Sequence, residues 1–142
     1  MGAMQRTKGA DGERTVAILI RYWLGLEVHR NWQGQAAAGG ADLSGVPGWA
    51  IEIKRAKEYR HEWWGQAVAQ AERAGAAPAL VFLIDYTRRG QHPLDRWRVI
   101  LPLATFGGIE FDHGETAEIS LRAWFTLIRE SLTTRGTPGQ VP

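Results

Sequence analysis

The stretch "ALVFLIDY", residues 79–86, restricts the fold most, because it is apolar over almost its whole length. A strand that faces water on one side alternates apolar and polar residues, whereas a strand covered on both faces reads as a continuous apolar run. We therefore expect this segment to be a central strand, with other elements packed on both faces of its sheet.

Periodicity elsewhere in the chain supplies those elements. Helical spacing of apolar residues predicts three helices, over about 11–24, 62–74 and 121–132. Asp11 is the expected N-cap of the first helix, and Pro78 lies where the second has ended. The inward residues of the first two helices are expected to be Val16, Ala17, Ile20, Leu24, Trp64, Ala67, Val68 and Ala71. Further strands are predicted over 27–32, 41–43, 49–54 and 96–106; Pro102 indicates that the last of these lies nearer an edge or that its regular pairing ends there.

The resulting order, αβββαββα, predicts a single α/β domain with a central mixed β-sheet flanked by helices. We place the domain at residues 5–134, and the polar, glycine- and proline-containing residues 135–142 are expected to form a disordered tail. No apolar run approaches the length of a membrane span, and no signal-peptide pattern opens the chain. The 142 residues include no cysteine, which excludes disulfides and thiolate metal sites and favours a cytoplasmic protein.

The segment "WAIEIK" carries two ionisable residues inside a predicted strand. Glu52 and Lys54 lie two residues apart and so project from the same face, whereas Ile51 and Ile53 project from the other. If residues 44–48 form a turn, Asp42 is brought close to this strand. Two converging carboxylates repel each other unless a cation neutralises them or one binds a proton. Oxygen ligands without cysteine or paired histidine favour Mg²⁺ or Mn²⁺ over zinc.

Glu13 is a further candidate, because it precedes Val16 and Ala17 by three or four residues and shares their inward helical face. A plainer explanation is that Glu13 stabilises the first turn of the helix through the helix dipole. Glu52 and Lys54 also have a plainer explanation, as a solvated ion pair on a strand. The combination of a helical Glu, an Asp before a turn, Glu-x-Lys and a following helix favours a catalytic site.

These motifs resemble the PD-(D/E)xK nuclease superfamily, and most closely its Holliday-junction-resolvase-like branch in archaeal and phage-type versions. The matching segments are "KGADGER", "GGAD", "AIEIK" and "HEWWGQA", between residues 8 and 70. The resemblance implies the αβββαβ restriction-endonuclease-like core, followed here by a further strand and a C-terminal helix. One departure is Ala41, which replaces the proline that usually precedes the family's aspartate.

The resemblance also implies roles for individual residues. Asp42 and Glu52 would hold Mg²⁺, for which Mn²⁺ can substitute, together with the backbone carbonyl of Ile53. Glu13 would complete the acidic cluster, Lys54 would assist the attacking water, and Gln66 would lie at the edge of the site.

The activity implied is hydrolysis of DNA phosphodiester bonds by in-line attack of a metal-bound water. A resolvase of this kind forms a symmetric homodimer that nicks opposing strands of a four-way junction, as in DNA recombination and repair. Its place would be the cytoplasm of a bacterial, archaeal or phage-infected host cell. No membrane and no nucleotide cofactor are expected as partners.

The net charge of the chain is compatible with DNA binding but is not strong evidence for it. The formal net charge is only +2, and the isoelectric point is about 9.3. Basic residues cluster locally, and the candidates for DNA contact are Arg30, Arg55, Lys57, Arg60 and His61. Solvated surface charge is the ordinary alternative for these residues.

Other carboxylates are weaker candidates for a site. Asp85 ends a buried strand and is expected to cap or pair there. Asp112 and His113 lie in an acidic, glycine-flanked segment that indicates a loop or an extra hairpin, and one Asp-His pair is a poor ligand set.

Two further functions remain open at this point. One is a nuclease for another form of DNA, such as a repair or restriction-like nickase. The other is a DNA-binding module on the same fold that does not cut, although such a module has no physical need for the Asp42, Glu52 and Lys54 set.

Overall fold

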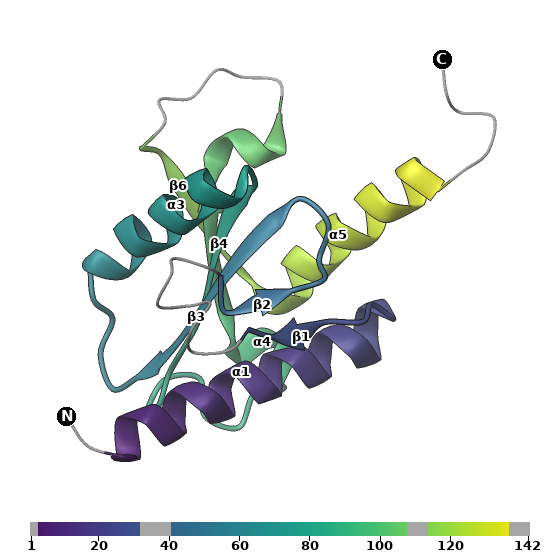
Figure 1. Ribbon diagram of the computed structural model, residues 1–142. Coiled ribbons are helices and arrows are strands. Elements are labelled where there is room, and N and C mark those ends of the chain that lie inside the picture. The colour runs from purple at the N-terminus through teal and green to yellow at the C-terminus, as the bar shows by residue number, and fades with distance from the viewer. Residues whose placement is uncertain (1–2, 32–40, 108–113, 137–142) are drawn as a thin grey trace.

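The computed structural model describes residues 3–31, 41–107 and 114–136, with side chains from residue 9 to residue 133 in these ranges. The elements occur in the order α1 (Ala3–Leu24), β1 (His29–Arg30), β2 (Leu43–Ser44), β3 (Trp49–Ala56), α3 (Glu62–Ala74), β4 (Ala77–Ile84), α4 (Pro93–Arg96), β5 (Arg98–Pro102), the 3₁₀ helix η1 (Leu103–Phe106), β6 (Thr116–Ser120) and α5 (Leu121–Gly136). Figure 1 shows α1 and α3 on opposite sides of the strands, with α5 beside the far end of α1.

The six strands form one mixed sheet in the order β1-β2-β3-β4-β5-β6. The central pair, β3 and β4, is parallel and is joined by the crossover helix α3, whereas the other pairs are antiparallel. The predicted α/β class, with a mixed sheet between helices, is confirmed. So is the prediction that "ALVFLIDY" belongs to a strand covered on both faces, because Ala79, Leu80, Val81, Phe82 and Leu83 are all buried.

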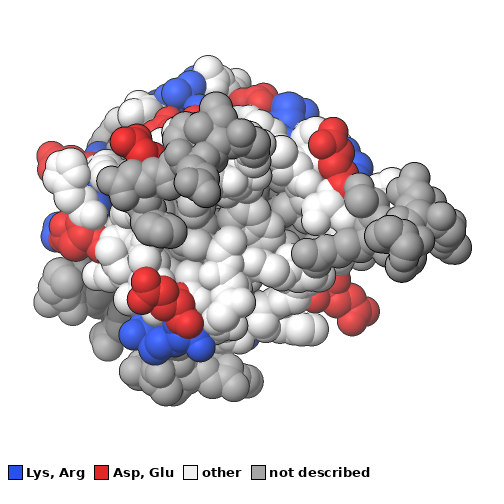
Figure 2. Space-filling model, turned by 90° about the horizontal axis from the view of Figure 1, so that it is seen from above, with Lys and Arg blue, Asp and Glu red and all other residues white. Residues whose placement is uncertain are grey.

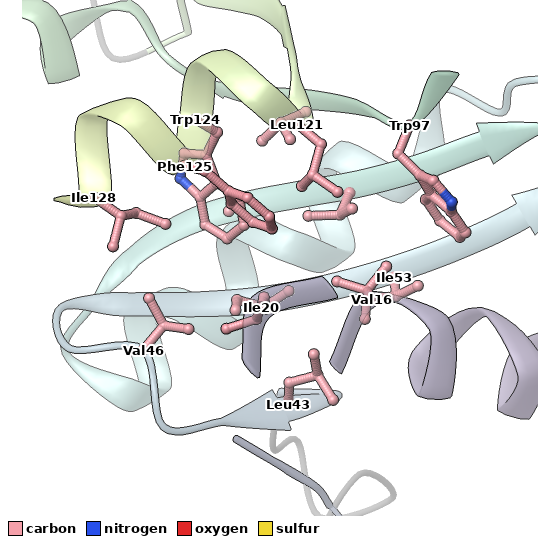
Figure 3. Packing of buried hydrophobic residues seen from close by; sticks show 14 of the residues in the cluster. Val16, Ile20, Leu43, Val46, Ile53, Trp97, Leu121, Trp124, Phe125 and Ile128 are labelled. Atoms are coloured by element: carbon pink, nitrogen blue, oxygen red, sulfur yellow. The ribbon is translucent and has the colours of Figure 1, made fainter. Parts of the chain in front are cut away.

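Alternation along β3 and β4 divides the interior into two clusters. The larger one joins Ile51, Ile53 and Val81 to residues of α1 and α5, including Val16, Ile20 and Trp124 (Figure 3). The smaller one packs Trp63 and Ala67 of α3 on Leu80 and Phe82. Glu52 and Lys54 therefore project toward α3, as their two-residue spacing predicts.

Several boundaries differ from the sequence-based expectations. Helix α1 begins at Ala3, so Asp11 is not its N-cap but an internal residue that pairs with Arg14 at 3.1 Å. Helix α3 ends at Gly75 in the left-handed conformation, and Pro78 lies within β4. On α3 the residue buried at the first turn is Trp63, while Trp64 and Val68 are half-buried.

The C-terminal third adds elements that the sequence did not indicate. Residues 116–118, the end of the segment expected to be a loop or an extra hairpin, belong to the edge strand β6, which pairs antiparallel with β5. Strand β5 is shorter than the predicted 96–106: its pairing ends at Pro102, where an end was expected, and residues 103–106 form η1. Asp112 and His113 lie outside the described residues, as do 137–142 of the expected tail, and α5 runs through Gly136. Among described residues, no helix is long and apolar enough to cross a membrane.

The turn between β2 and β3 depends on Gly45. Its φ is +117°, and a Cβ built there would overlap the carbonyl oxygen of Glu27 and touch the Cα of Val28. The turn is therefore packed directly on the backbone that leads into β1.

Gly45→Ala is expected to lower the free energy of unfolding by roughly 3 kcal/mol or more, because both backbone strain and overlap with a main-chain atom must be relieved. The matched control is Gly75→Ala, which has φ +65° but open space around it and should cost only about 1 kcal/mol. Urea denaturation of both variants measures the difference, and equal losses would contradict the packing described.

Candidate functional site

Asp42 is fixed to β3 by hydrogen bonds in both directions. Its N–H donates to the Ile51 carbonyl at 2.9 Å, and its Oδ2 accepts from the Ile53 N–H at 2.7 Å. Leu43 pairs with Ile51, so the same antiparallel register carried one residue further sets Asp42 opposite Glu52. The predicted hairpin thus brings the two carboxylates together across neighbouring strands.

Glu52 lies in the interior, with 5% of its surface exposed. Its Oε1 is 3.3 Å from the Lys54 Nζ. Its Oε2 is buried and has no hydrogen-bond partner among the residues that the structure describes, and the same holds for Oε1 of Gln70 on α3. Two orphaned acceptor oxygens in the interior are unusual, because a buried acceptor without a donor costs about 1–3 kcal/mol.

Glu13 approaches this pair from α1. Its Oε2 accepts from the Arg30 Nε of β1 at 2.9 Å. Its negative charge raises the pKa of both Asp42 and Glu52, which places it within electrostatic range of the two. Glu13 is partly exposed, so it stands at the solvent side of the pair.

The electrostatics of the site disfavour charge on both carboxylates at once. Burial, followed by the charge of Glu52, raises the pKa of Asp42 to about 7, against the lowering effects of the Ile53 N–H and Lys54. Burial likewise raises the pKa of Glu52, while Lys54 and a hydrogen bond from Gln70 oppose it. In the absence of a cation, the site relieves its repulsion by holding a proton near neutral pH.

The donor set is suited to a hard divalent cation. Within the described ranges no group of three or more His, Asp or Glu side chains is placed to hold a metal ion. Mg²⁺, however, is commonly bound by one or two carboxylates and keeps several waters. Two facing carboxylates, one with a free buried oxygen, meet that requirement. The N–H of Ile53 points to Asp42, and its carbonyl shares that edge of the strand.

The structure sets Gln70, which the sequence did not single out, nearer to Glu52 than the expected Gln66. Gln66 is exposed on α3, whereas Gln70, one turn later, lies beside Glu52. A crossover helix runs antiparallel to the strands that it connects, so residues late in α3 lie over the first half of β3. That geometry, together with the small Ala67 and Ala71 on the buried side, is the signal that would have favoured Gln70.

The basic residues expected to contact DNA occupy two places. Arg30 lies at the site through its ion pair with Glu13. The others lie at the carboxyl end of β3 or after it: Arg55 pairs with Asp85 at 3.1 Å, Arg60 with Glu62 at 3.7 Å, and Lys57 and His61 are exposed. The pairing expected of Asp85 is confirmed. Figure 2 shows charges of both signs around a broad uncharged area, and no single-sign field in that view.

Comparison with known proteins identifies the family. The family model described as "Phage putative PDDEXK endonuclease" matches residues 4–112, well over half of the chain. The chain therefore belongs to this family of phage PD-(D/E)xK endonucleases, and the superfamily indicated by the sequence motifs is confirmed.

A solved structure is also similar, that of Hjc from Archaeoglobus fulgidus, which is a Holliday junction resolvase from an archaeal hyperthermophile. The match has 20% sequence identity and a TM-score of 0.46, and covers 82% of this chain and 87% of that one. No curated protein sequence matches the chain.

The raised pKa of Asp42 predicts how stability depends on pH. The pKa of Asp42 is 3.8 in the unfolded chain and about 7 in the folded protein. At pH values between these two, the folded protein binds a proton on Asp42 that the unfolded chain does not. The free energy of unfolding should therefore fall as the pH rises from about 4 to about 7. Asp42→Asn should remove this part of the fall, because the amide is neutral and keeps an oxygen for the Ile53 N–H.

Urea denaturation in EDTA, at about pH 5 and about pH 8, measures the effect in the wild type and the variant. An identical fall in both proteins would show that Asp42 does not titrate in this range.

Proposed function

We propose that this endonuclease is a divalent-metal-dependent, structure-selective DNA nuclease, and that its substrate is the four-way junction, cut by symmetric paired nicks. The proposed site residues are Glu13, Asp42, Glu52 and Lys54, with Gln70 beside them. The observation that supports it most is the buried Glu52 carboxylate, which faces Asp42 and has one oxygen without a partner.

A purely structural role explains this arrangement poorly. A lysine contact to one carboxylate oxygen does not satisfy the other, and a second carboxylate opposite adds repulsion. A protein that only needed a stable strand would be better served by apolar residues at these positions. The same reasoning disfavours a DNA-binding module that does not cut.

In the proposed site Asp42, Glu52 and the Ile53 carbonyl hold Mg²⁺ or Mn²⁺, with Glu13 contributing directly or through water. The bound cation would supply charge neutralisation at the phosphate and acidify water near neutral pH. The proton that Asp42 holds without metal would leave when the cation binds, so metal affinity should rise with pH through about 7.

Lys54 and Gln70 would then have separate tasks. The Lys54 ammonium, 3.3 Å from Glu52 and partly exposed, is able to orient the attacking water and to offset charge that develops on the phosphate. Gln70 would fix the orientation of the Glu52 carboxylate by its hydrogen bond. Arg30 is placed to reach a phosphate that approaches Glu13.

The junction and the homodimer belong to the proposal for a physical reason. A four-way junction has two-fold symmetry, and two identical sites related by a two-fold axis nick opposing strands. Contacts to the DNA backbone report its shape rather than its sequence, which suits a nuclease that selects branched DNA.

Glu52→Gln is expected to reduce cleavage of a synthetic four-way junction by at least about a thousandfold, because it removes the charge that holds the cation. Junction binding should be retained or tightened, since a negative charge near the phosphates is gone. Cleavage is measured on labelled junctions with Mg²⁺, and binding by gel shift in EDTA.

A linear duplex is the control substrate, and Glu62→Gln, on the exposed surface, is the control for loss of one carboxylate. Normal cleavage by Glu52→Gln would rule out the proposed site. Equal cutting of junction and duplex by the wild type would support nuclease activity but contradict selectivity for the junction. A strict monomer on sedimentation would leave paired nicking without a basis.

Gln70→Ala and Gln66→Ala form a matched pair one helical turn apart. Gln70→Ala should reduce the Mn²⁺-induced rise in melting temperature and lower junction cleavage by about 10- to 100-fold. Gln66→Ala should change both by less than about twofold. The reverse pattern would support the position that the sequence motif suggests and contradict the role given to Gln70.

A further inference from the structure

The sheet face that carries α3 is covered only in part. Helix α3 packs over β3 and β4, and beyond it β4, β5 and β6 floor an open groove of about 470 Å³. Phe82, Ile84 and Ile100 form the apolar floor, and Tyr59, from the loop before α3, forms one wall. A hollow of this size suits one small aromatic group and falls well short of a stable protein interface.

Tyr59 presents a ring that is held in place from behind. Its ring packs edge-on against Trp63 at 5.2 Å and against Phe82 at 5.4 Å, yet 37% of its surface stays exposed. Burial and the nearby negative charge of Glu118 raise the pKa of Tyr59, so its phenol stays neutral. A fixed, exposed and neutral aromatic ring is what a nucleic acid base stacks on.

Arg88 supplies a cation at the same groove. Among the described non-glycine residues, Arg88 is the one with a positive φ, 54°. Residues held in the left-handed backbone region often cluster at functional sites. The loop around it is fixed by Arg96, which donates to the carbonyls of Thr87 at 3.2 Å and Asp85 at 2.5 Å.

The charge of Arg88 is available to a ligand. No hydrogen bond or ion pair is found for its side chain within the described part of the chain. Arg98, also in the groove, is paired with Glu118 at 3.2 Å. The neighbouring Arg89 lies over the ring of Tyr86, 4.7 Å from its centre, and is not part of the groove lining.

The groove is connected to the candidate site through the sheet. Lys54 pairs with Phe82, and Phe82 pairs with Arg98, so the three side chains lie in one row on the same face. Strands are about 4.8 Å apart, which puts the floor of the groove one to two strands from Lys54, with the start of α3 between them. The groove therefore lies on the same face of the sheet as the Lys54 side chain.

We propose that the groove holds one nucleotide that has left the base stack of the DNA substrate. The base stacks on Tyr59 over the apolar floor, Arg88 binds its phosphate, and the Arg98–Glu118 pair offers a donor and an acceptor to the base edge. This rests on the proposed function, since it takes DNA as the substrate, and it adds that the preferred DNA contains unpaired nucleotides.

The test is binding of fluorescein-labelled DNA, read by anisotropy in EDTA so that nothing is cut. The probes are a short single strand and a duplex of the same sequence. Arg88→Gly removes the cation and relieves the backbone strain, so it should fold at least as well as the wild type. It should weaken single-strand binding by about tenfold and duplex binding by less than about threefold.

Arg89→Ala is the matched control, because it removes the same charge one residue away, and it should weaken either probe by less than about threefold. Tyr59→Leu, which keeps apolar packing, should lose about tenfold on the single strand, and Tyr59→Phe should restore it. A 2-aminopurine base in the single strand should be quenched by the wild type and not by Tyr59→Leu.

Equal losses for Arg88→Gly and Arg89→Ala on both probes would overturn the proposal, because general charge alone would explain them. Unchanged DNA binding with a halved sedimentation mass in the groove variants would also overturn it, in favour of a second copy of the chain. A wild type that binds the single strand as described but cuts no DNA would overturn the proposed function, whereas the proposal that the groove binds a nucleotide would stand. A wild type that binds neither probe but cuts the four-way junction would overturn the groove proposal and leave the proposed function standing.

Discussion

The buried carboxylate of Glu52 is the constraint on which the arrangement of this molecule depends. Taking an ionised group out of water costs several kcal/mol unless neighbouring groups compensate it. Here Lys54 and Gln70 compensate the charge of Glu52 in part, the charges of Asp42 and Glu13 oppose it, and one oxygen has no partner among the described residues. The β2–β3 hairpin, α3 and α1 each bring one of these side chains close to the Glu52 carboxylate.

The periodic parts of the molecule were accessible from the sequence. Alternation across residues 49–54 correctly assigned Ile51 and Ile53 to one face and Glu52 and Lys54 to the other. The turn at 44–48 correctly brought Asp42 to the same strand, since turn residues and apolar strands have local signatures. The family motifs extended this to Glu13, whose placement depends on long-range packing.

What the sequence did not indicate was decided by packing between distant segments. The pair Asp11 and Gly12 looks like a helix start, because glycine lowers helix propensity. In the fold, Gly12 is buried, a Cβ built there would make ordinary contacts with Ile53 and Trp97 at 3.5 Å, and α1 continues through it. The edge strand β6 was missed because its partner β5 is needed to give it a register. The choice between Gln66 and Gln70 required the direction of α3 relative to β3.

The order of the strands has a consequence for how the molecule assembles. All six strands follow one another in the sheet as they do in the chain; the parallel pairing of β3 with β4 spans the crossover helix α3, whereas the antiparallel pairings join segments that are nearer in sequence. Contacts of this kind form quickly, because little loop entropy is lost. The late step should be the docking of the two ends, where Arg129 of α5 donates to the carbonyl of Trp23 of α1 at 2.8 Å, across 106 residues. Because α1 carries Glu13, and also packs on β3 and pairs with Arg30 of β1, the docking of α5 would secure a helix that the candidate site depends on.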